Sequence, residues 1–332
     1  MTEDVTEDMT GDMTEDVTED SEVKVVVSER RDAADGVVAL TLTPLDGGPL
    51  PTWRPGAHID LQLTNGLTRQ YSLCGDPRDQ SAWQVAVLRE PEGRGGSAFV
   101  HDELQPGTTL AVSAPRNNFE LLPAERYLFV AGGIGITPLL PMIAEANERG
   151  AQWTLLYGGR TRASMAFRDE LAEYGENVRL RPQDEYGLLD LASEFGDIDD
   201  QALIYACGPE PMLRAVANTS AHWPAEALHT ERFAPVEVGV PVRSDAFDVV
   251  LARSGRKVTV KPGRSILETV EAAGVDVLFS CREGTCGTCE TDVLAGEPEH
   301  RDSLLTEAER AANETMFICV SRSLGAELTL DL

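Results

Sequence analysis

Apolar and polar positions alternate over short stretches along the first third of the chain. Turn residues such as Asp-Gly-Gly, Arg-Pro-Gly and Thr-Asn-Gly separate these stretches. Short strands divided in this way are typical of an antiparallel barrel. A single helical insertion is predicted over 96–104. The predicted strands cover 23–27, 36–44, 57–63, 69–73, 83–90 and 108–115.

From about residue 126 the pattern changes to apolar strands that alternate with helical segments. This alternation predicts a parallel, doubly wound sheet with helices on both faces. Strands are predicted over 127–133, 153–159, 177–183 and 202–208, and helices over 137–150, 167–175 and 209–220.

The last part of the chain combines strand patterns with one helix, predicted over 264–274, and follows an aperiodic stretch that contains two prolines. Its strands are predicted over 247–252, 257–260 and 327–332. The complete pattern divides the chain into a tail over 1–21, a barrel over 22–122, a doubly wound domain over 123–232, a linker over 233–245 and a C-terminal domain over 246–332.

The net charge of the chain excludes some classes of binding partner. The 332 residues include 28 Lys and Arg against 56 Asp and Glu, which gives a formal charge of −28. Nucleic acid and anionic membranes repel such a surface, so we expect neither as a partner. There is no run of eighteen apolar residues and no basic, apolar leader at the N-terminus, so we expect a cytoplasmic protein.

The first twenty residues form five similar units of four residues, with nine acidic side chains and no basic one. So little apolar surface cannot offset the entropy lost on ordering, and disorder is predicted. The alternative is a docking helix with an apolar stripe of Met and Val.

Four of the six cysteines carry the strongest chemical signal. Cys281, Cys286 and Cys289 have the spacing C-x4-C-x2-C, and Cys319 follows thirty residues later. This is the ligand spacing of a plant-type [2Fe–2S] cluster. A zinc site would favour two C-x2-C pairs, and unrelated free thiols are the other alternative. Cys74 and Cys207 lie in other domains and are expected to be unligated.

Glycine-containing segments supply the remaining candidates. AGGIGITP over 131–138 and CGPEPM over 207–212 each follow a strand and lead into a helix, where backbone amides suit a pyrophosphate. RQYS over 69–72 and GRGGS over 93–97 together suit a phosphorylated aromatic ring. Taken singly, these segments are also consistent with tight turns and an ordinary strand that bind nothing.

These motifs, in this order along the chain, resemble those of the phthalate dioxygenase reductase family. The resemblance covers about 23–332 and implies a flavin-binding antiparallel barrel, a nucleotide-binding doubly wound domain and a C-terminal β-grasp ferredoxin domain. It implies that the flavin is contacted by Arg69, Tyr71, Ser72, Gly95, Gly96, Ser97, Thr137 and Phe233. It places the dinucleotide near Gly132, Gly133, Cys207, Gly208 and Pro209, and the cluster on Cys281, Cys286, Cys289 and Cys319.

The resemblance also implies a function. The protein would be a monomeric reductase component that passes electrons from NADH through FMN and the cluster to a terminal oxygenase. FAD is the less expected flavin, and Arg160 and Arg162 leave NADPH open because arginines can accommodate a 2′-phosphate. The five histidines are scattered, and no acid–base residue is assigned. Glu283 and Glu290 flank the cysteines as a candidate docking face.

Two alternatives from other classes remain at this point. One is a stand-alone flavin and iron–sulfur reductase that has a different electron acceptor. The other is a redox-sensing or structural protein that binds flavin without turnover.

Overall fold

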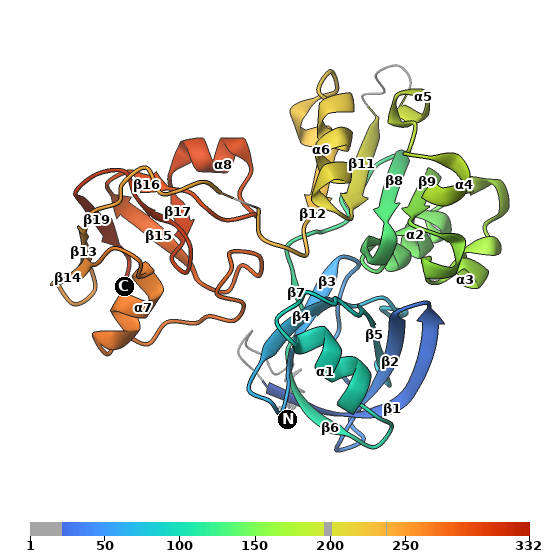
Figure 1. Ribbon diagram of the computed structural model, residues 1–332, viewed down its shortest axis with the longest axis horizontal. Coiled ribbons are helices and arrows are strands. Elements are labelled where there is room, and N and C mark those ends of the chain that lie inside the picture. The colour runs from blue at the N-terminus through green and yellow to red at the C-terminus, as the bar shows by residue number, and fades with distance from the viewer. Residues whose placement is uncertain (1–21, 196–200, 237) are drawn as a thin grey trace, which may run out of the picture.

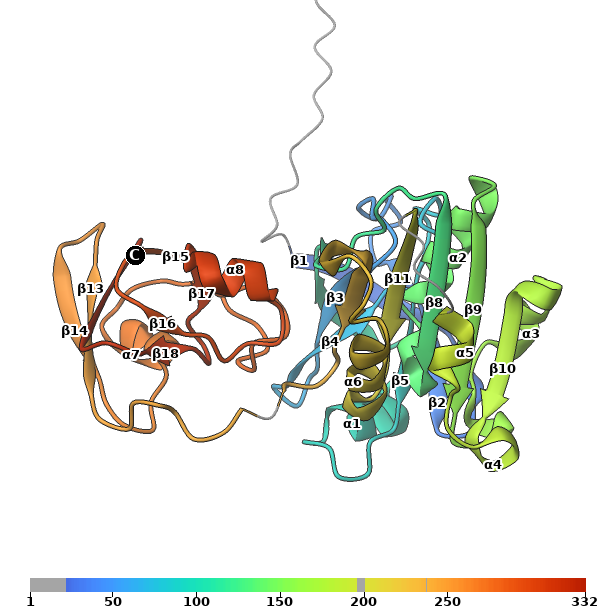
Figure 2. The same ribbon diagram turned by 90° about the horizontal axis from the view of Figure 1, so that it is seen from above.

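Three sheets follow one another along the chain. The computed structural model describes residues 22–195, 201–236 and 238–332, and each sheet is built from a consecutive part of them (Figure 1). The acidic repeat, predicted to be disordered, lies outside the described residues. The view from above shows the C-terminal part beside the other two parts, next to strands β3 (Ala57–Gln62) and β4 (Thr68–Ser72) (Figure 2).

The first sheet is antiparallel and has the strand order β4-β3-β6-β1-β2-β5, with β7 paired to β3. A bridge between Leu73 and Val85 links its two ends, so the sheet closes on itself as a barrel. Helix α1 (Gly96–Glu103) is its one α-helix. The strands are β1 (Glu22–Ala34), β2 (Val37–Pro44), β3 (Ala57–Gln62), β4 (Thr68–Ser72), β5 (Trp83–Leu88), β6 (Thr109–Ser113) and β7 (Arg116–Asn117).

The second sheet is entirely parallel, with the order β10-β9-β8-β11-β12. The order reverses between β8 and β11, and open α/β sheets bind ligands at such a switch point, beyond the carboxyl ends of the strands. The strands are β8 (Arg126–Gly132), β9 (Gln152–Gly159), β10 (Val178–Pro182), β11 (Ala202–Cys207) and β12 (Leu228–Glu231). The helices are α2 (Leu139–Glu148), α3 (Arg168–Ala172), α4 (Gln183–Tyr186), α5 (Leu191–Phe195) and α6 (Glu210–Thr219).

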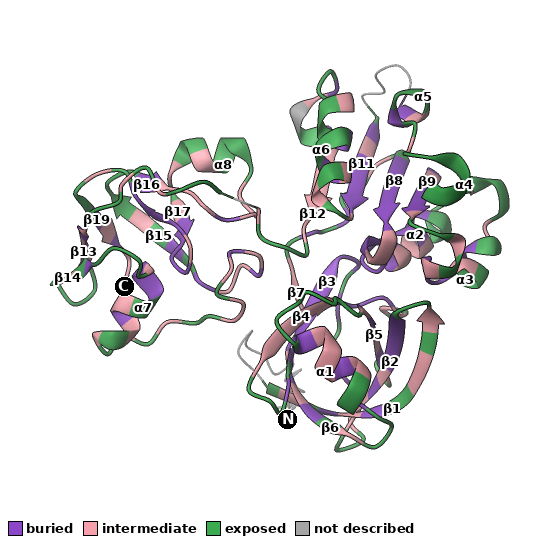
Figure 3. Cartoon of the chain, in the orientation of Figure 1, coloured by how far each residue is buried: buried purple, intermediate pink, exposed green. Residues whose placement is uncertain are grey.

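Strand β8 is buried on both faces, as a central parallel strand should be (Figure 3). Tyr127 and Phe129 pack into the cluster that includes α2, whereas Leu128 and Val130 pack into the one that includes α5 and α6. Helices therefore cover both faces of the sheet, as the alternating pattern predicts.

The third sheet has the order β14-β13-β19-β15-β17 and combines a parallel central pair, β13 with β19, with antiparallel neighbours. Helix α7 (Ile266–Ala272) begins with a capping box between Ser265 and Glu268 and buries its apolar side in the core of this sheet, an arrangement typical of the β-grasp fold. The strands are β13 (Phe247–Leu251), β14 (Arg256–Val260), β15 (Glu290–Ala295), β17 (Thr315–Phe317) and β19 (Glu327–Leu330). A separate pair, β16 (Pro298–Glu299) and β18 (Arg322–Ser323), and helix α8 (Glu307–Ala312) complete this part.

The segment predicted as a linker, 233–245, contains no helix or strand among its described residues. It is attached to β16 and to the loop that follows β16 in the C-terminal part. The Val236 amide donates to Ser303 Oγ at 2.9 Å, Arg301 donates to the Gly239 carbonyl at 2.6 Å, and the Val242 amide donates to Glu299 at 3.1 Å. This segment therefore belongs physically to the C-terminal part.

Some local expectations differ from the structure. Strand β12 is not predicted, because Leu-His-Thr-Glu is a short, largely polar edge strand. Helix α3 ends at Ala172, earlier than predicted, and the chain turns at Gly175, which has a φ of +58°. Among the described residues, no helix is both long enough and apolar enough to cross a membrane.

Candidate functional site

The N-terminus of α1 and Arg69 form the predicted phosphate cradle. Gly95 adopts a left-handed conformation with φ +85°, and no side chain caps the first amides of the helix. Arg69 of β4 lies directly across Gly96, since a Cβ on Gly96 would come within 2.4 Å of Arg69 Nε. Arg69 also donates to the Arg94 carbonyl at 3.3 Å, and the Ser97 hydroxyl accepts from the Glu90 amide at 3.0 Å. A guanidinium beside uncapped amides fits a phosphate group.

Tyr71 and Ser72 follow Arg69 on β4. Burial raises the pKa of Tyr71 to about 12, so its hydroxyl remains a hydrogen-bond donor at neutral pH. Ser72 is buried, and its hydroxyl donates to Glu231 Oε2 over 3.5 Å. Strand β4, which carries Arg69, therefore also contacts the parallel sheet through Ser72.

Glu231 is a residue that the sequence analysis does not assign to the site. It ends β12 and lies beside Cys207 of β11 in register, with the Cys207 thiol 4.0 Å from its Oε2. Desolvation raises its pKa to about 8, and the hydrogen bond from Ser72 acts in the opposite direction. A carboxyl group that is neutral at physiological pH thus stands where the barrel meets the parallel sheet.

The two glycine loops of the parallel sheet contact each other at the switch point. A Cβ on Gly132 would lie 2.6 Å from Pro209 Cδ, and one on Gly135 would lie 2.2 Å from the Cys207 carbonyl oxygen. Only glycine permits this close approach of the two backbones. The left-handed backbone at Gly133, with φ +56°, also favours glycine. The structure thus brings Gly132 next to Gly208 and Pro209, and Gly135 next to Cys207, while Gly133 lies in the turn between these two contacts.

Two further predicted residues border this site. Thr137 is buried, and its hydroxyl donates to the Ile134 carbonyl at 3.0 Å, which ties it to the turn between β8 and α2. Burial raises the pKa of the Cys207 thiol, which therefore stays neutral. Phe233, two residues beyond Glu231, is 48 % exposed. Its ring is thus available to a ligand, and its contact with a flavin remains a prediction.

The two arginines near the predicted ribose site differ in their surroundings. Arg162 donates twice to Glu185, from Nε at 3.0 Å and from Nη2 at 2.6 Å. The hydrogen bonds from Arg162 lower the pKa of Glu185. Arg160 contributes its backbone carbonyl to the Asp184 amide at 3.2 Å. The Arg162 guanidinium is therefore already paired with a carboxylate, and its contact with a 2′-phosphate remains a prediction.

The four predicted cluster ligands come together, with Cys281, Cys286 and Cys289 on one loop and Cys319 just after β17. Hydrogen bonds among the thiols lower the pKa of Cys281 and Cys289 and raise that of Cys286 and Cys319. Three residues with left-handed backbone curl the loop, namely Arg282 (φ +58°), Gly284 (φ +70°) and Gly287 (φ +81°). Within the described part of the chain, no group of three or more His, Cys, Asp or Glu side chains is arranged to hold a single metal ion.

Donors surround the sulfur atoms of this loop. The backbone amide of Glu283 donates to Cys281 Sγ at 3.2 Å, and the Thr288 hydroxyl lies 3.2 Å from Cys286 Sγ. Thr285 also hydrogen-bonds to Cys281 and lowers the pKa of that thiol. Donors of this kind offset negative charge on sulfur, which fits four thiolates around a [2Fe–2S] cluster.

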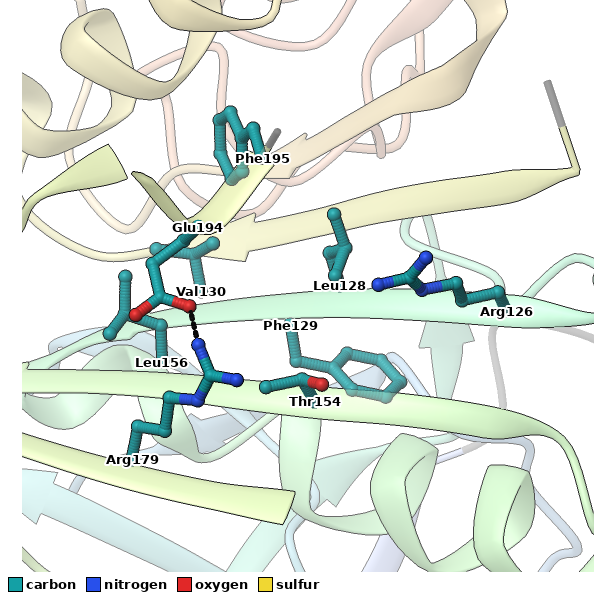
Figure 4. A pocket seen from close by; sticks show the side chains of 9 residues that line it. All are labelled: Arg126, Leu128, Phe129, Val130, Thr154, Leu156, Arg179, Glu194 and Phe195. Atoms are coloured by element: carbon teal, nitrogen blue, oxygen red, sulfur yellow. Dashed lines mark hydrogen bonds and ion pairs between the residues drawn. The ribbon is translucent and has the colours of Figure 1, made fainter. Parts of the chain in front are cut away.

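A small cavity in the parallel sheet is separate from these loops. It has a volume of about 40 Å³ and lies where α5 covers β8 and β9, with the ion pair between Arg179 and Glu194 across it (Figure 4). No predicted site residue lines it, and it is far too small for a nucleotide. The candidate site therefore consists of the loops at the strand ends and not of this cavity.

Comparisons with known proteins match the second and third parts of the chain. Residues 129–218 match the oxidoreductase NAD-binding domain, and residues 249–324 match the 2Fe-2S iron-sulfur cluster binding domain. The carnitine monooxygenase reductase subunit of Escherichia coli (strain K12) is 41 % identical over 320 residues, which cover 93 % of this chain and 98 % of that protein.

Two solved structures are similar over 94 % of this chain. Phthalate dioxygenase reductase, described as a modular structure for electron transfer from pyridine nucleotides to [2Fe–2S], is 35 % identical with a TM-score of 0.69 and is covered over 98 %. An intact type IV self-sufficient cytochrome P450 monooxygenase is 47 % identical with a TM-score of 0.87. This chain spans only 41 % of the P450 protein.

The separation of the thiol loop from the other loops generates a prediction. Cys286→Ser should abolish the iron–sulfur absorbance and lower cytochrome c reduction by roughly tenfold or more, because the cluster requires four thiolates. Reduction of ferricyanide by NADH should persist, since the flavin and nucleotide residues lie on other sheets. Both activities are measured on the purified protein.

Cys74→Ser is the matched control for this substitution. Cys74 is a buried thiol in the barrel, and its Sγ lies 3.5 Å from the Gln84 carbonyl oxygen, so serine can replace it. This variant should keep the iron–sulfur absorbance. Loss of both activities in Cys286→Ser, together with normal folding, would contradict the separate roles of the sheets.

Proposed function

The chain belongs to the phthalate dioxygenase reductase family, and on that premise we propose that it serves as the reductase component of an oxygenase system. It passes electrons from NADH through FMN and a [2Fe–2S] cluster to a terminal oxygenase. When bound, the flavin accepts the two electrons of a hydride, and the cluster takes electrons one at a time. The protein itself supplies position, charge and shielding.

One observation carries this proposal. The loop with three of the four converging thiols and the strand with the flavin-type cradle belong to different sheets, yet the Arg94 side chain next to the cradle contacts Glu283 in the thiol loop at 2.5 Å. The cradle strand in turn reaches the nucleotide loops through Ser72 and Glu231. A chain of contacts therefore runs from the nucleotide loops through the flavin strand to the cluster loop.

Each group of residues has a proposed role. Arg69 and the amides of Gly95, Gly96 and Ser97 hold the FMN phosphate, while Tyr71 and Ser72 lie along its ring system and Thr137 and Phe233 border it. The glycines at 132 and 133 admit the dinucleotide, with Cys207, Gly208 and Pro209 next to the nicotinamide. Cys281, Cys286, Cys289 and Cys319 hold the cluster. The protein works as a monomer in the cytoplasm.

We propose NADH rather than NADPH as the electron donor. The support is the bidentate contact between Arg162 and Glu185, which leaves a negative carboxylate near the expected 2′ position. That carboxylate repels a 2′-phosphate and occupies the arginine that would bind it.

The test of the proposed function is a reconstitution. The purified protein is mixed with NADH and with purified candidate oxygenases, and substrate oxidation is measured with each component omitted in turn. Oxidation that requires this chain, NADH and one oxygenase supports the proposal. Rapid reduction of cytochrome c together with no transfer to any oxygenase would favour a stand-alone reductase.

Glu231 generates a prediction about pH. Its pKa of about 8 means that the carboxyl group is neutral below pH 8 and negative above it. A negative charge next to the flavin site disfavours the electron-rich reduced flavin. The rate of flavin reduction by NADH should therefore fall as pH rises through about 8, and Glu231→Gln should remove this fall.

The measurement is stopped-flow absorbance at 450 nm over pH 6 to 9.5, with Glu120→Gln as the control. Glu120 is an exposed barrel residue that pairs with Arg54 at 3.0 Å, so its variant should keep the wild-type profile. An identical fall in the wild type and in Glu231→Gln would show that another group titrates.

Nucleotide choice provides a second prediction from this site. Glu185→Gln should raise kcat/KM for NADPH by roughly fivefold, because it removes a repulsive charge and releases Arg162 for a 2′-phosphate. The value for NADH should change much less. Glu185→Gln combined with Arg162→Gln should lose the gain with NADPH, and a gain that persisted in this double variant would refute the role of Arg162.

A further inference from the structure

The barrel and the cluster loop meet at two side-chain contacts. The first is made by Asn118, which directly follows β7 and whose Nδ2 donates to the Cys286 carbonyl at 3.1 Å. Asn118 also packs against the next residue of the loop, since a Cβ on Gly287 would come within 2.8 Å of Asn118 Nδ2. The barrel thus holds the backbone of a predicted cluster ligand and of its neighbour.

The second contact is the ion pair between Arg94 Nη2 and Glu283 Oε2 at 2.5 Å. Only 26 % of the Glu283 side chain is exposed, so this carboxylate is engaged within the chain. This corrects the expectation that Glu283 belongs to a docking face for another protein. Glu290, the other member of that face, is exposed and accepts a hydrogen bond from Thr315 at 2.7 Å.

Both contacts start from the barrel segments that surround the flavin strand. Arg94 precedes Gly95 of the phosphate cradle, and its carbonyl accepts from Arg69. Strand β7 pairs with β3, which in turn pairs with the flavin strand β4.

We propose that Asn118 and the pair of Arg94 with Glu283 form a joint that holds the cluster loop in electron-transfer contact with the flavin site. We call these residues, with Cys286 and Gly287, the flavin–cluster joint. This inference rests on the proposed function. In the step that it serves, the reduced flavin loses one electron and one iron of the cluster changes from ferric to ferrous, with no covalent bond formed or broken.

The covalent connection alone cannot provide this contact. Residues 236, 239 and 242 of the linker are bonded to the C-terminal part, so the linker moves with that part. The link to the parallel sheet is then confined to the few residues after Arg232, which is itself anchored to Glu210 at 3.1 Å. One point of attachment leaves rotation free, whereas the two contacts of the joint fix the orientation of the cluster loop.

The polar contact of Asn118 suits a positioning residue. Asparagine donates to the carbonyl through a short side chain, which fixes the separation of the two backbones within hydrogen-bonding distance. Asn118→Asp keeps this shape but replaces the donor with a carboxylate oxygen that faces the Cys286 carbonyl. The substitution therefore opposes docking without removing a cluster ligand or a flavin ligand.

The experiment follows both chromophores of the holoprotein in an anaerobic stopped-flow instrument after NADH is added. Flavin reduction is the first phase, and cluster reduction is the second. In Asn118→Asp the second phase should slow by roughly tenfold, as expected when a donor to a buried carbonyl becomes repulsive. The first phase should stay within twofold of the wild-type rate.

The ion pair allows a test by rescue. Glu283→Arg places two guanidinium groups together, so it should also slow the second phase. Adding Arg94→Glu to this variant restores an opposite-charge pair and should recover most of the lost rate. Arg253→Glu disrupts an exposed ion pair of the third sheet, with Asp331, and should leave the second phase unchanged.

Iron content, the EPR spectrum of the dithionite-reduced cluster and its reduction potential separate positioning from damage to the cluster. Iron content and the EPR spectrum should match the wild type in Asn118→Asp and Glu283→Arg, and the measured reduction potential shows how much of the slowing comes from a change in driving force. Wild-type second-phase rates in both variants would refute the proposed role of the joint. If Asn118→Asp does not fold, Glu283→Arg and its rescue by Arg94→Glu still test this role, because Arg94 is exposed. A wild-type cluster that NADH cannot reduce would overturn the proposed function itself, which is a separate result.

Discussion

Electrons cross between separate groups only over short distances, and this constraint determines how the three sheets are assembled. In each of the three parts, a loop next to a sheet has a glycine where another part of the chain approaches its backbone. Gly132 and Gly135 allow one nucleotide loop to touch the other, Gly96 lies under Arg69 in the phosphate cradle, and Gly287 allows Asn118 to reach the cluster loop. Close backbone approach is the shared physical device at all three sites.

Charged and neutral groups are also distributed unevenly among the three sites. Amide and hydroxyl donors face the sulfur atoms of the cluster loop, and an arginine with uncapped helix amides faces the phosphate cradle. Where the barrel meets the parallel sheet, Glu231 and Cys207 are kept neutral by burial. The protein thus places charge at the edges of the cofactor path and removes it from the point where the barrel and the parallel sheet meet.

Much of this could be predicted from sequence because the signals are local. The spacing of Cys281, Cys286 and Cys289 reflects one tight loop, and the glycine segments lie directly between a strand and a helix. Glu231 was missed because β12 is a short edge strand without apolar periodicity. The pairings of Asn118 with Cys286 and of Glu283 with Arg94 could not be predicted either, since the partners lie 168 and 189 residues apart in the sequence. Contacts between sheets of this kind leave no periodic pattern.

The central claim is that one chain carries electrons from NADH to the iron–sulfur cluster through a flavin. The most direct measurement is an anaerobic titration of the purified holoprotein with NADH, followed by flavin absorbance and by EPR on the same samples. Flavin bleaching should be accompanied by the EPR signal of a reduced [2Fe–2S] cluster, up to about one spin per protein. Complete flavin bleaching without a cluster signal would contradict it.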